Sequence, residues 1–168
     1  MSKVKKKIPN IRLWIVGNGS YKSNLITKVN DAGLQDSIFF FNYMPHDDLI
    51  DLLLEADIAL IPHMKSEQSD NSSPNKLYEY AYASKPVLCS NCNSLERLVS
   101  EMQNGMIYIN DLSDSFAEIC VKLVREKDLK TMGESGKIAV INKHNWENSV
   151  TALLNIYRGN STNTNLAN

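Results

Sequence analysis

Long hydrophobic runs and an excess of one charge are both missing from this sequence. The longest apolar stretches, such as Ile38–Phe41 and Ile58–Pro62, are far shorter than the roughly 20 residues that a helix needs to span a bilayer. Lysine and arginine number 18 against 19 aspartates and glutamates, so no overall field draws the chain to nucleic acid or to lipid. Because no hydrophobic leader follows Met1, the expected location is the cytoplasm.

Cysteine and histidine are scarce, with 3 residues of each. Three cysteines cannot all pair, and a reduced chain is the simplest interpretation. Cys89 and Cys92 have the spacing of a redox motif, and a helix starting there would lower the pKa of Cys89. The order of the surrounding elements, however, is not that of a thioredoxin-like fold. The histidines are scattered at positions 46, 63 and 144, so the sequence predicts no metal site and no other cofactor.

Strand-like and helix-like segments alternate along the chain. Short apolar runs predict strands at Arg12–Val16, Ser37–Phe41, Asp57–Ile61, Pro86–Cys89 and Met106–Ile109. Apolar positions at helical spacing predict helices over 21–32, 46–55, 75–84, 113–125, 129–142 and 146–158, with a short helix capped by Asn93 before the last strand. This order predicts a Rossmann-like α/β fold, in which helices flank both faces of a parallel sheet.

The length of 168 residues is most simply that of one domain. We expect this domain over residues 1–158, followed by a disordered polar tail over 159–168. In open parallel sheets, ligands bind beyond the carboxyl ends of the strands. The candidate site walls are therefore the loops at 17–21, 42–46, 62–75 and 90–93. The third of these is long for a compact domain, and loops of that length are usually functional or mobile.

The most informative stretch, NSSPNKLYEYAY, covers the end of that third loop and the first part of the helix after it. Ser73 suits a helix N-cap, and Pro74 suits the first helical position. The free backbone N–H groups that follow would form an anion site with the helix dipole; they belong to Asn75, Lys76 and Leu77. A lysine in a first helical turn is unfavourable by roughly 0.3–1 kcal/mol, which a bound anion would offset. The alternative is that Lys76 simply points into water.

Glu79 lies one helical turn beyond Lys76. A carboxylate at that place can accept two hydroxyl hydrogen bonds, as from the diol of a ribose. The alternative for Glu79 is an ordinary exposed residue on the helix face.

The segment SPNKLYEYAYASKPVLCS resembles the core motif of the retaining glycosyltransferases of family 4, which have the GT-B fold. LWIVGNGS is similar to a strand of that family that ends in a Gly-x-Gly loop. FFNYMPHDDLIDLLLEADIALIP is similar to the strand, helix and strand that precede the motif. Glu96 with Gly105, and then HNWENSVTALLNIY, are similar to the stretches that follow it. Together these pieces extend the resemblance over residues 11–158.

The resemblance implies the donor-binding half of such an enzyme, which takes a sugar from a nucleoside-diphosphate sugar. Glu79 would bind the ribose, and the helix start would hold the diphosphate through Pro74, Asn75, Lys76 and Leu77. The base would meet the loop of Asn42, Tyr43 and Met44, mainly through backbone groups. The turn of Gly17 and Gly19 would let the backbone approach the ligand closely.

The implied chemistry is glycosyl transfer with retention, in which negative charge grows on the leaving diphosphate. Fixed N–H dipoles and Lys76 would stabilise that charge. Asn71 stands where the family has a second glutamate that contacts the donor sugar, eight positions before Glu79. Asp70 lies beside it, and Glu67 is another carboxylate of the same loop. Asn71 and Lys76 are therefore the candidate catalytic residues.

The sequence also departs from the family at its start. The basic residues that grip the donor phosphates in the family follow a strand that would precede KVKKKIPNIRLWIV, and Arg12 is not at the matching place. That strand is central in the family's sheet, between the strands that correspond to RLWIV and DIALI. This chain is therefore expected either to leave a gap there or to close the strand order differently. The acceptor-binding N-terminal lobe is missing as well.

The resemblance thus predicts the donor half of a cytosolic retaining glycosyltransferase in surface polysaccharide biosynthesis. Its expected partners are a nucleotide sugar and an acceptor lobe from the same protein or a separate chain, with peripheral membrane contact through the full-length enzyme. The isolated chain is expected to be inactive. The alternative is a non-catalytic nucleotide-binding or interaction module that acts with a partner chain. A flavodoxin-like or receiver domain is a more distant alternative, which GNGSYKS matches poorly.

Overall fold

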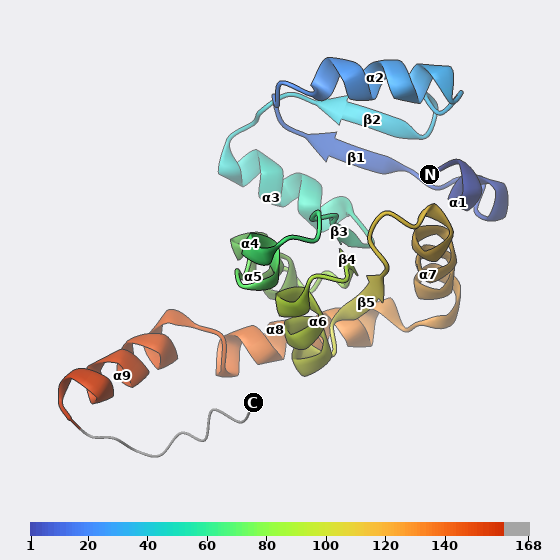
Figure 1. Ribbon diagram of the computed structural model, residues 1–168. Coiled ribbons are helices and arrows are strands. Elements are labelled where there is room, and N and C mark those ends of the chain that lie inside the picture. Colours follow the sequence, from blue (N-terminus) through green and yellow to red (C-terminus); the bar gives the residue numbers. More distant parts are fainter. Residues whose placement is uncertain (160–168) are drawn as a thin grey trace.

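The computed structural model describes residues 1–159 as an α/β fold with parallel strands (Figure 1). The strands are β1 (Leu13–Val16), β2 (Ile38–Phe41), β3 (Ala59–Ile61), β4 (Val87–Ser90) and β5 (Gly105–Tyr108). The helices are α1 (Ser2–Lys7), α2 (Lys22–Asp31), α3 (His46–Glu55), α4 (Glu67–Asp70), α5 (Asn75–Tyr82), α6 (Asn93–Met102), α7 (Ser113–Glu126), α8 (Leu129–Asn142) and α9 (Trp146–Tyr157). All the expected strands and helices are present, and α4 is an additional helix in the loop after β3. The expected disordered tail lies outside the described residues, except for Gly159.

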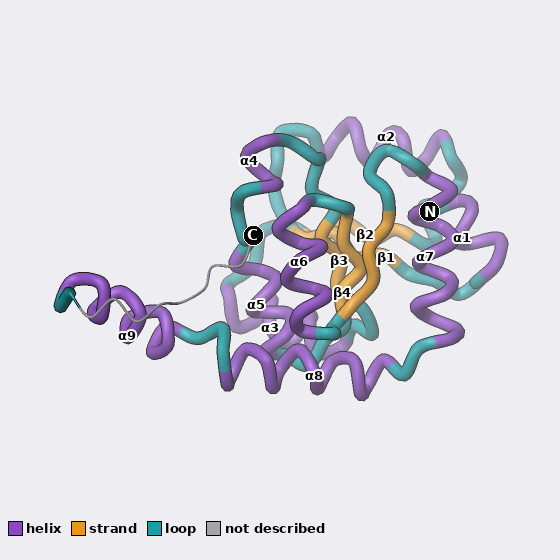
Figure 2. The backbone as a smooth tube through the Cα atoms, turned by 60° about the horizontal axis from the view of Figure 1, so that its bottom comes forward, coloured by secondary structure: helices purple, strands orange, loops and turns teal. Residues whose placement is uncertain are grey.

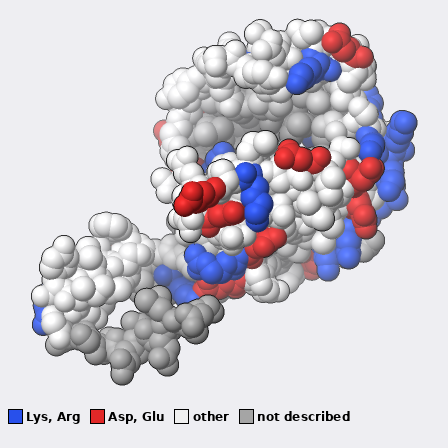
Figure 3. Space-filling view, viewed as in Figure 1, with Lys and Arg blue, Asp and Glu red and all other residues white. Residues whose placement is uncertain are grey.

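The strands form two parallel sheets. β1 pairs with β2, and β3, β4 and β5 pair in that order. In the first sheet Leu13 lies opposite Ile38, and in the second Ala59 lies opposite Val87. Among the described residues no strand pairing joins β1 to β3, so the single sheet that the alternation predicted is divided. Of the two expected outcomes, the chain shows the gap, and the space-filling view shows the surface hollowed beside it (Figure 3).

The sheet of β3, β4 and β5 is covered on both faces. One buried cluster joins it to α5 and α6, and the other joins it to α1 and α7, which lie on the opposite side of the strands (Figure 2). All of β4 is buried, as is typical of a parallel strand with helices on both faces. Leu88 packs into one cluster and Cys89 into the other, because successive side chains of a strand point to opposite faces.

Helix α8 packs closely against α5 because glycine lies at the contact. A Cβ atom added at Gly133 would stand 2.0 Å from the backbone oxygen of Ser84, far closer than any real contact. The absent side chain therefore sets the distance between the two helices.

Helix α6 begins differently from the expectation. Asn93 is its first residue and not its cap, and the side chain of Asp70 accepts a hydrogen bond from the Asn93 amide at 2.8 Å. An acidic side chain from another loop therefore serves the amino end of this helix, where it also suits the helix dipole.

Helix α9 extends away from the rest of the chain (Figure 1). Its large side chains are exposed, with Trp146 at 74% and Tyr157 at 81% of their full accessibility. None of the helices in the described part of the chain is long and apolar enough to cross a membrane.

Candidate functional site

Several predicted site residues, together with neighbours that were not predicted, form two clusters, each after the carboxyl ends of parallel strands. The Lys22 cluster follows β1 and β2 and consists of Gly17, Lys22, Phe41 and Asn42. The Lys76 cluster follows β3 and the long loop after it and consists of His63, Pro74, Asn75, Lys76 and Glu79. No hydrogen bond or ion pair between described residues joins the two clusters.

In the Lys22 cluster the chain turns sharply at Gly17, whose φ is +141°. Side chains rarely tolerate that conformation, so glycine is favoured there. A Cβ atom added at Gly17 or at Gly19 would meet nothing within 4 Å. The turn therefore faces open space, as the predicted close approach of a ligand requires. The loop after β2 is also accessible: Asn42 is exposed, and Tyr43 is 77% exposed.

Lys22 was not among the predicted site residues. Its ammonium group donates hydrogen bonds to the carbonyl oxygens of Gly17 and Phe41 and to Oδ1 of Asn42. The available signal was its place in the first turn of a helix after a Gly-x-Gly loop, where a positive charge opposes the helix dipole. The same signal drew attention to Lys76.

In the Lys76 cluster, α5 starts at Asn75, as its predicted range does, but its cap differs from the prediction. Its N-cap is Pro74 and not Ser73, and no side chain caps it. The reason is that the carbonyl oxygen of Pro74 already accepts the Leu77 amide, at 3.0 Å. Leu77 is fully buried, so its amide is not offered to a ligand. The amides of Asn75 and Lys76 have no acceptor among the described residues, and these two remain as anion donors.

The charged side chains around this helix start are not neutralised by the chain itself. Lys76 and Glu79 are exposed, and neither side chain forms a hydrogen bond or ion pair with a described residue. Partial burial lowers the pKa of His63, and the nearby charge of Lys76 lowers it further. His63 is therefore neutral at pH 7 beside a free cation. An unpaired lysine and open amides at a helix start are suited to an anion.

The long loop before α5 is held in place. It contains α4, and Ser66 and Ser69 form a capping box at the start of that helix. The single hydroxyl donor of Ser94 in α6 lies within hydrogen-bond reach of two carbonyl oxygens, at 2.9 Å from that of Ser69 and 2.7 Å from that of Ser72. The backbone that leads into the Lys76 cluster is therefore fixed before any ligand arrives.

The two polar residues at the end of α4 differ in availability. Asp70 is occupied by the Asn93 amide, with Lys65 at 3.7 Å. Asn71 is exposed, and its side-chain nitrogen donates to the carbonyl oxygen of Glu67 at 2.9 Å. The side-chain oxygen of Asn71 has no donor among the described residues.

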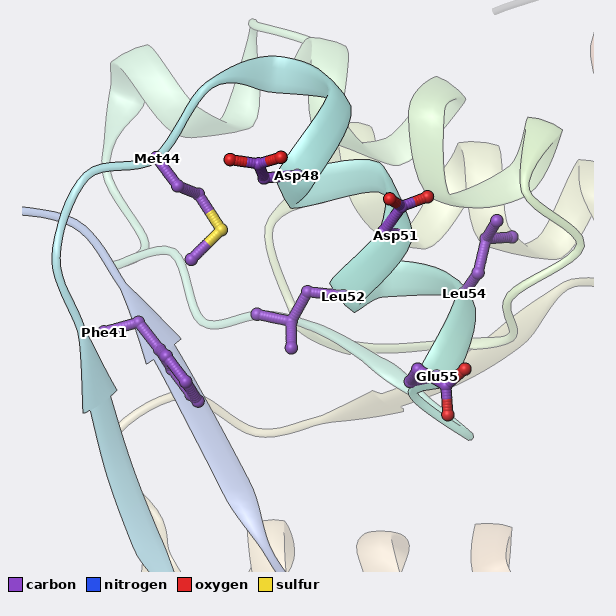
Figure 4. A pocket seen from close by; sticks show the side chains of 7 residues that line it. All are labelled: Phe41, Met44, Asp48, Asp51, Leu52, Leu54 and Glu55. Atoms are coloured by element: carbon purple, nitrogen blue, oxygen red, sulfur yellow. The ribbon is translucent and has the colours of Figure 1, made fainter.

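A crevice of about 490 Å³ lies between the end of β2 and α3 (Figure 4). Met44 and Leu52 point toward each other across it. Met44 is the only predicted site residue in its lining, which also contains Asp48, Asp51 and Glu55. Three carboxylates repel a diphosphate, so this crevice does not suit the predicted anion.

The burial of the two thiols argues against the redox alternative. Cys89 and Cys92 are both buried. Burial raises the pKa of Cys89 to about 12, and the neighbouring Cys92 is the second, smaller cause. The expectation that a helix start would lower this pKa was wrong, because desolvation of the thiolate outweighs the helix dipole. A thiol that stays protonated at pH 7 is a poor nucleophile.

A protein-family model described as "Glycosyl transferases group 1" matches residues 1–139. The amylovoran biosynthesis glycosyltransferase AmsK of Erwinia amylovora is 24% identical over 128 residues, which are 76% of this chain and 30% of that protein. The chain therefore spans less than a third of this relative.

Two solved structures share the fold. One is the C-terminal domain of a group 1 glycosyl transferase (LpcC) from Francisella tularensis, with a TM-score of 0.71 and 18% identity over 86% of this chain and 75% of that one. The other is Anabaena Alr3699/HepE in complex with UDP, with a TM-score of 0.67 and 17% identity over 95% of this chain and 44% of that one. They confirm the predicted architecture, that of a GT-B C-terminal domain.

Proposed function

The chain belongs to the glycosyl transferases group 1 family, and on that premise we propose that it is the donor-binding lobe of a retaining glycosyltransferase. The observation that carries the proposal is the start of α5. The amides of Asn75 and Lys76 and the Lys76 ammonium all belong to the first turn of this helix, and none of them has an acceptor among the described residues. A diphosphate supplies the negative charge that such a helix start binds. The UDP bound to Alr3699/HepE, which shares the fold, supports a nucleotide as the ligand.

Each part of the donor has a place in this proposal. The diphosphate binds the amides of Asn75 and Lys76 and the Lys76 ammonium. The carboxylate of Glu79 accepts hydrogen bonds from the two ribose hydroxyls. The base meets the loop of Asn42, Tyr43 and Met44, opposite the turn at Gly17.

The proposed reaction transfers the sugar with retention of configuration. The bond between the anomeric carbon and the phosphate oxygen breaks, and the acceptor oxygen bonds to the same carbon on the same face. The acceptor's proton leaves with the diphosphate. Charge that grows on the diphosphate is stabilised by the helix amides and by Lys76, which are in place before the reaction. Asn71 offers its side-chain oxygen to a sugar hydroxyl, and neutral His63 offers a further hydrogen bond.

The complete enzyme needs an acceptor-binding lobe from polypeptide outside this sequence. The similarity to a glycosyltransferase of amylovoran biosynthesis supports a role in polysaccharide biosynthesis. The chain alone is expected to bind a nucleoside diphosphate without transferring sugar.

Titration calorimetry with uridine and guanosine diphosphates tests the proposal. Glu79→Ala should weaken binding at least tenfold, because two hydrogen bonds to a charged acceptor are lost. Glu118→Ala on α7 removes an equally exposed carboxylate and should leave the affinity unchanged. Equal affinity in wild type and Glu79→Ala, or no binding of either nucleotide by the wild type, would refute the assignment.

A non-catalytic nucleotide-binding module is the second candidate. It is favoured by the loop before α5, where Asp70 is occupied by α6 and an amide, Asn71, takes the place of a carboxylate. Sugar transfer by the complete enzyme, with its acceptor lobe, excludes this candidate.

A further inference from the structure

Lys22 binds three oxygen atoms with its one ammonium group. Its Nζ lies 3.1 Å from the carbonyl oxygen of Gly17, 2.8 Å from that of Phe41 and 2.8 Å from Oδ1 of Asn42. An ammonium has three N–H donors and no acceptor. All three donors are therefore used within the chain, and none remains for a ligand.

The three acceptors belong to two separate segments, and the Phe41 oxygen is at the end of β2. Gly17 begins the turn that follows β1, and Asn42 begins the loop that follows β2. The last backbone bond between the two strands runs from the Gly17 amide to the Phe41 oxygen, at 3.2 Å. Beyond that point no backbone hydrogen bond between described residues connects the two segments. Lys22 connects them there with its side chain instead.

Other restraints on these loops are few. Val16 and Phe41 are only partly buried, and Asn42 and Tyr43 are exposed. Residues of β1, α2 and β2 contribute to neither of the two buried clusters. Packing therefore does little to fix the spacing of the loops, and charge-assisted hydrogen bonds, which are stronger than neutral ones, carry that task.

Lys28 on the same helix is a matched comparison. It is exposed, and among the described residues its ammonium donates only to the hydroxyl of Tyr21, at 3.1 Å. The two lysines have the same charge and the same helix, and only Lys22 connects two loops.

We propose that Lys22 is a positioning residue for the nucleoside end of the donor. It holds the turn at Gly17 and the loop of Asn42, Tyr43 and Met44 at a fixed spacing, so that ribose and base enter a prepared gap. It does not contact the phosphates, which belong to α5. This inference rests on the proposed function.

Calorimetry with two probes separates positioning from phosphate binding. Lys22→Met should weaken uridine or guanosine diphosphate about tenfold, the loss of roughly one charge-assisted hydrogen bond. It should leave the affinity for inorganic pyrophosphate unchanged, because pyrophosphate has no nucleoside. Lys28→Met should change neither affinity. If Lys22→Met weakened both probes equally, Lys22 would be a phosphate ligand and the positioning role would be overturned.

The three hydrogen bonds of Lys22 form a clamp between the turn at Gly17 and the end of β2. Amide hydrogen exchange tests this clamp without any ligand. In Lys22→Met the Gly17 amide should exchange at least tenfold faster, whereas the Leu88 amide in β4 should keep its rate and report an intact fold. Unchanged exchange at Gly17 would overturn the clamp even if nucleotide binding were established. Conversely, a wild type that binds pyrophosphate and no nucleotide would refute the proposed donor while leaving the exchange result standing.

A milder variant guards against misfolding of Lys22→Met. Asn42→Ala removes one of the three acceptors and keeps the lysine. It should weaken nucleotide binding about threefold and leave pyrophosphate unaffected, and an unchanged nucleotide affinity would count against the clamp.

Discussion

The two sheets of this molecule are both parallel, but they differ strongly in how far they are buried. Every residue of β4 is buried, whereas every residue of β1 is only partly buried. Both buried clusters border the sheet of β3, β4 and β5, and neither includes a residue of β1 or β2. The start of α5 is therefore supported by a packed core, whereas the turn at Gly17 is supported by a two-stranded sheet. The two halves of the candidate site rest on different physical foundations.

The edge of β1 that does not pair with β2 has no strand beside it among the described residues. In a parallel ladder alternate residues bond to the neighbour on one side. Leu13 and Gly17 donate to β2, so the amides of Trp14 and Val16 point to the opposite edge. There, no described residue accepts them. Such an edge is stabilised only by water or by an added strand.

Truncating a core side chain in each region is the strongest challenge to the contrast. Leu95→Ala removes a fully buried side chain of α6 and should lower the free energy of unfolding by about 3 kcal/mol. Ile15→Ala in β1 removes a partly buried one and should cost about 1 kcal/mol. Urea denaturation followed by circular dichroism measures both, and equal losses would show that β1 has a core of its own.

Adding a methyl group at a glycine in each region sharpens the contrast. Gly133→Ala places Cβ against the backbone of Ser84, and the clash should exceed the gain in helix propensity by about 2 kcal/mol. Gly19→Ala meets open space and should change stability by less than about 0.5 kcal/mol. Thermal unfolding of the two variants checks this, and a stable Gly133→Ala would mean that α8 is free to move away from α5.

Alkaline pH should destabilise the packed region, where the pKa of Cys89 is shifted. The pKa of Cys89 is raised to about 12 in the fold, above its unfolded value near 9. Stability is therefore complete below about pH 9 and falls between pH 9 and pH 12, because only the unfolded chain loses the proton there. Cys89→Ala should reduce this fall in a denaturation series from pH 8 to pH 11, whereas an identical pH profile would place the origin elsewhere.

Most elements were predictable because each has a local signal. The ranges of α3 and α8 agree with the prediction to the residue, since their apolar spacing and their ends are both written in the local sequence. Helix starts that depend on distant partners were not predictable. Asp70 caps α6 from another loop, and no local pattern around Asn93 reveals that.

The candidate site shows the same division. The Gly-x-Gly turn and the start of α5 were predicted from residue types alone, because glycine permits backbone conformations that other residues avoid and proline fixes φ wherever it occurs. The three hydrogen bonds of Lys22 depend on how two loops meet in space. The split between the sheets could be predicted only as one of two outcomes, because local sequence does not record which strands become neighbours.

The buried thiols can report the order in which parts of this chain open. Cys89 and Cys92 lie on one face of the packed sheet and Cys120 on the other, so a maleimide dye added to the native protein reaches none of them until the chain opens. The order in which the three react would tell which layer of helices lifts away first, with no label engineered into the protein.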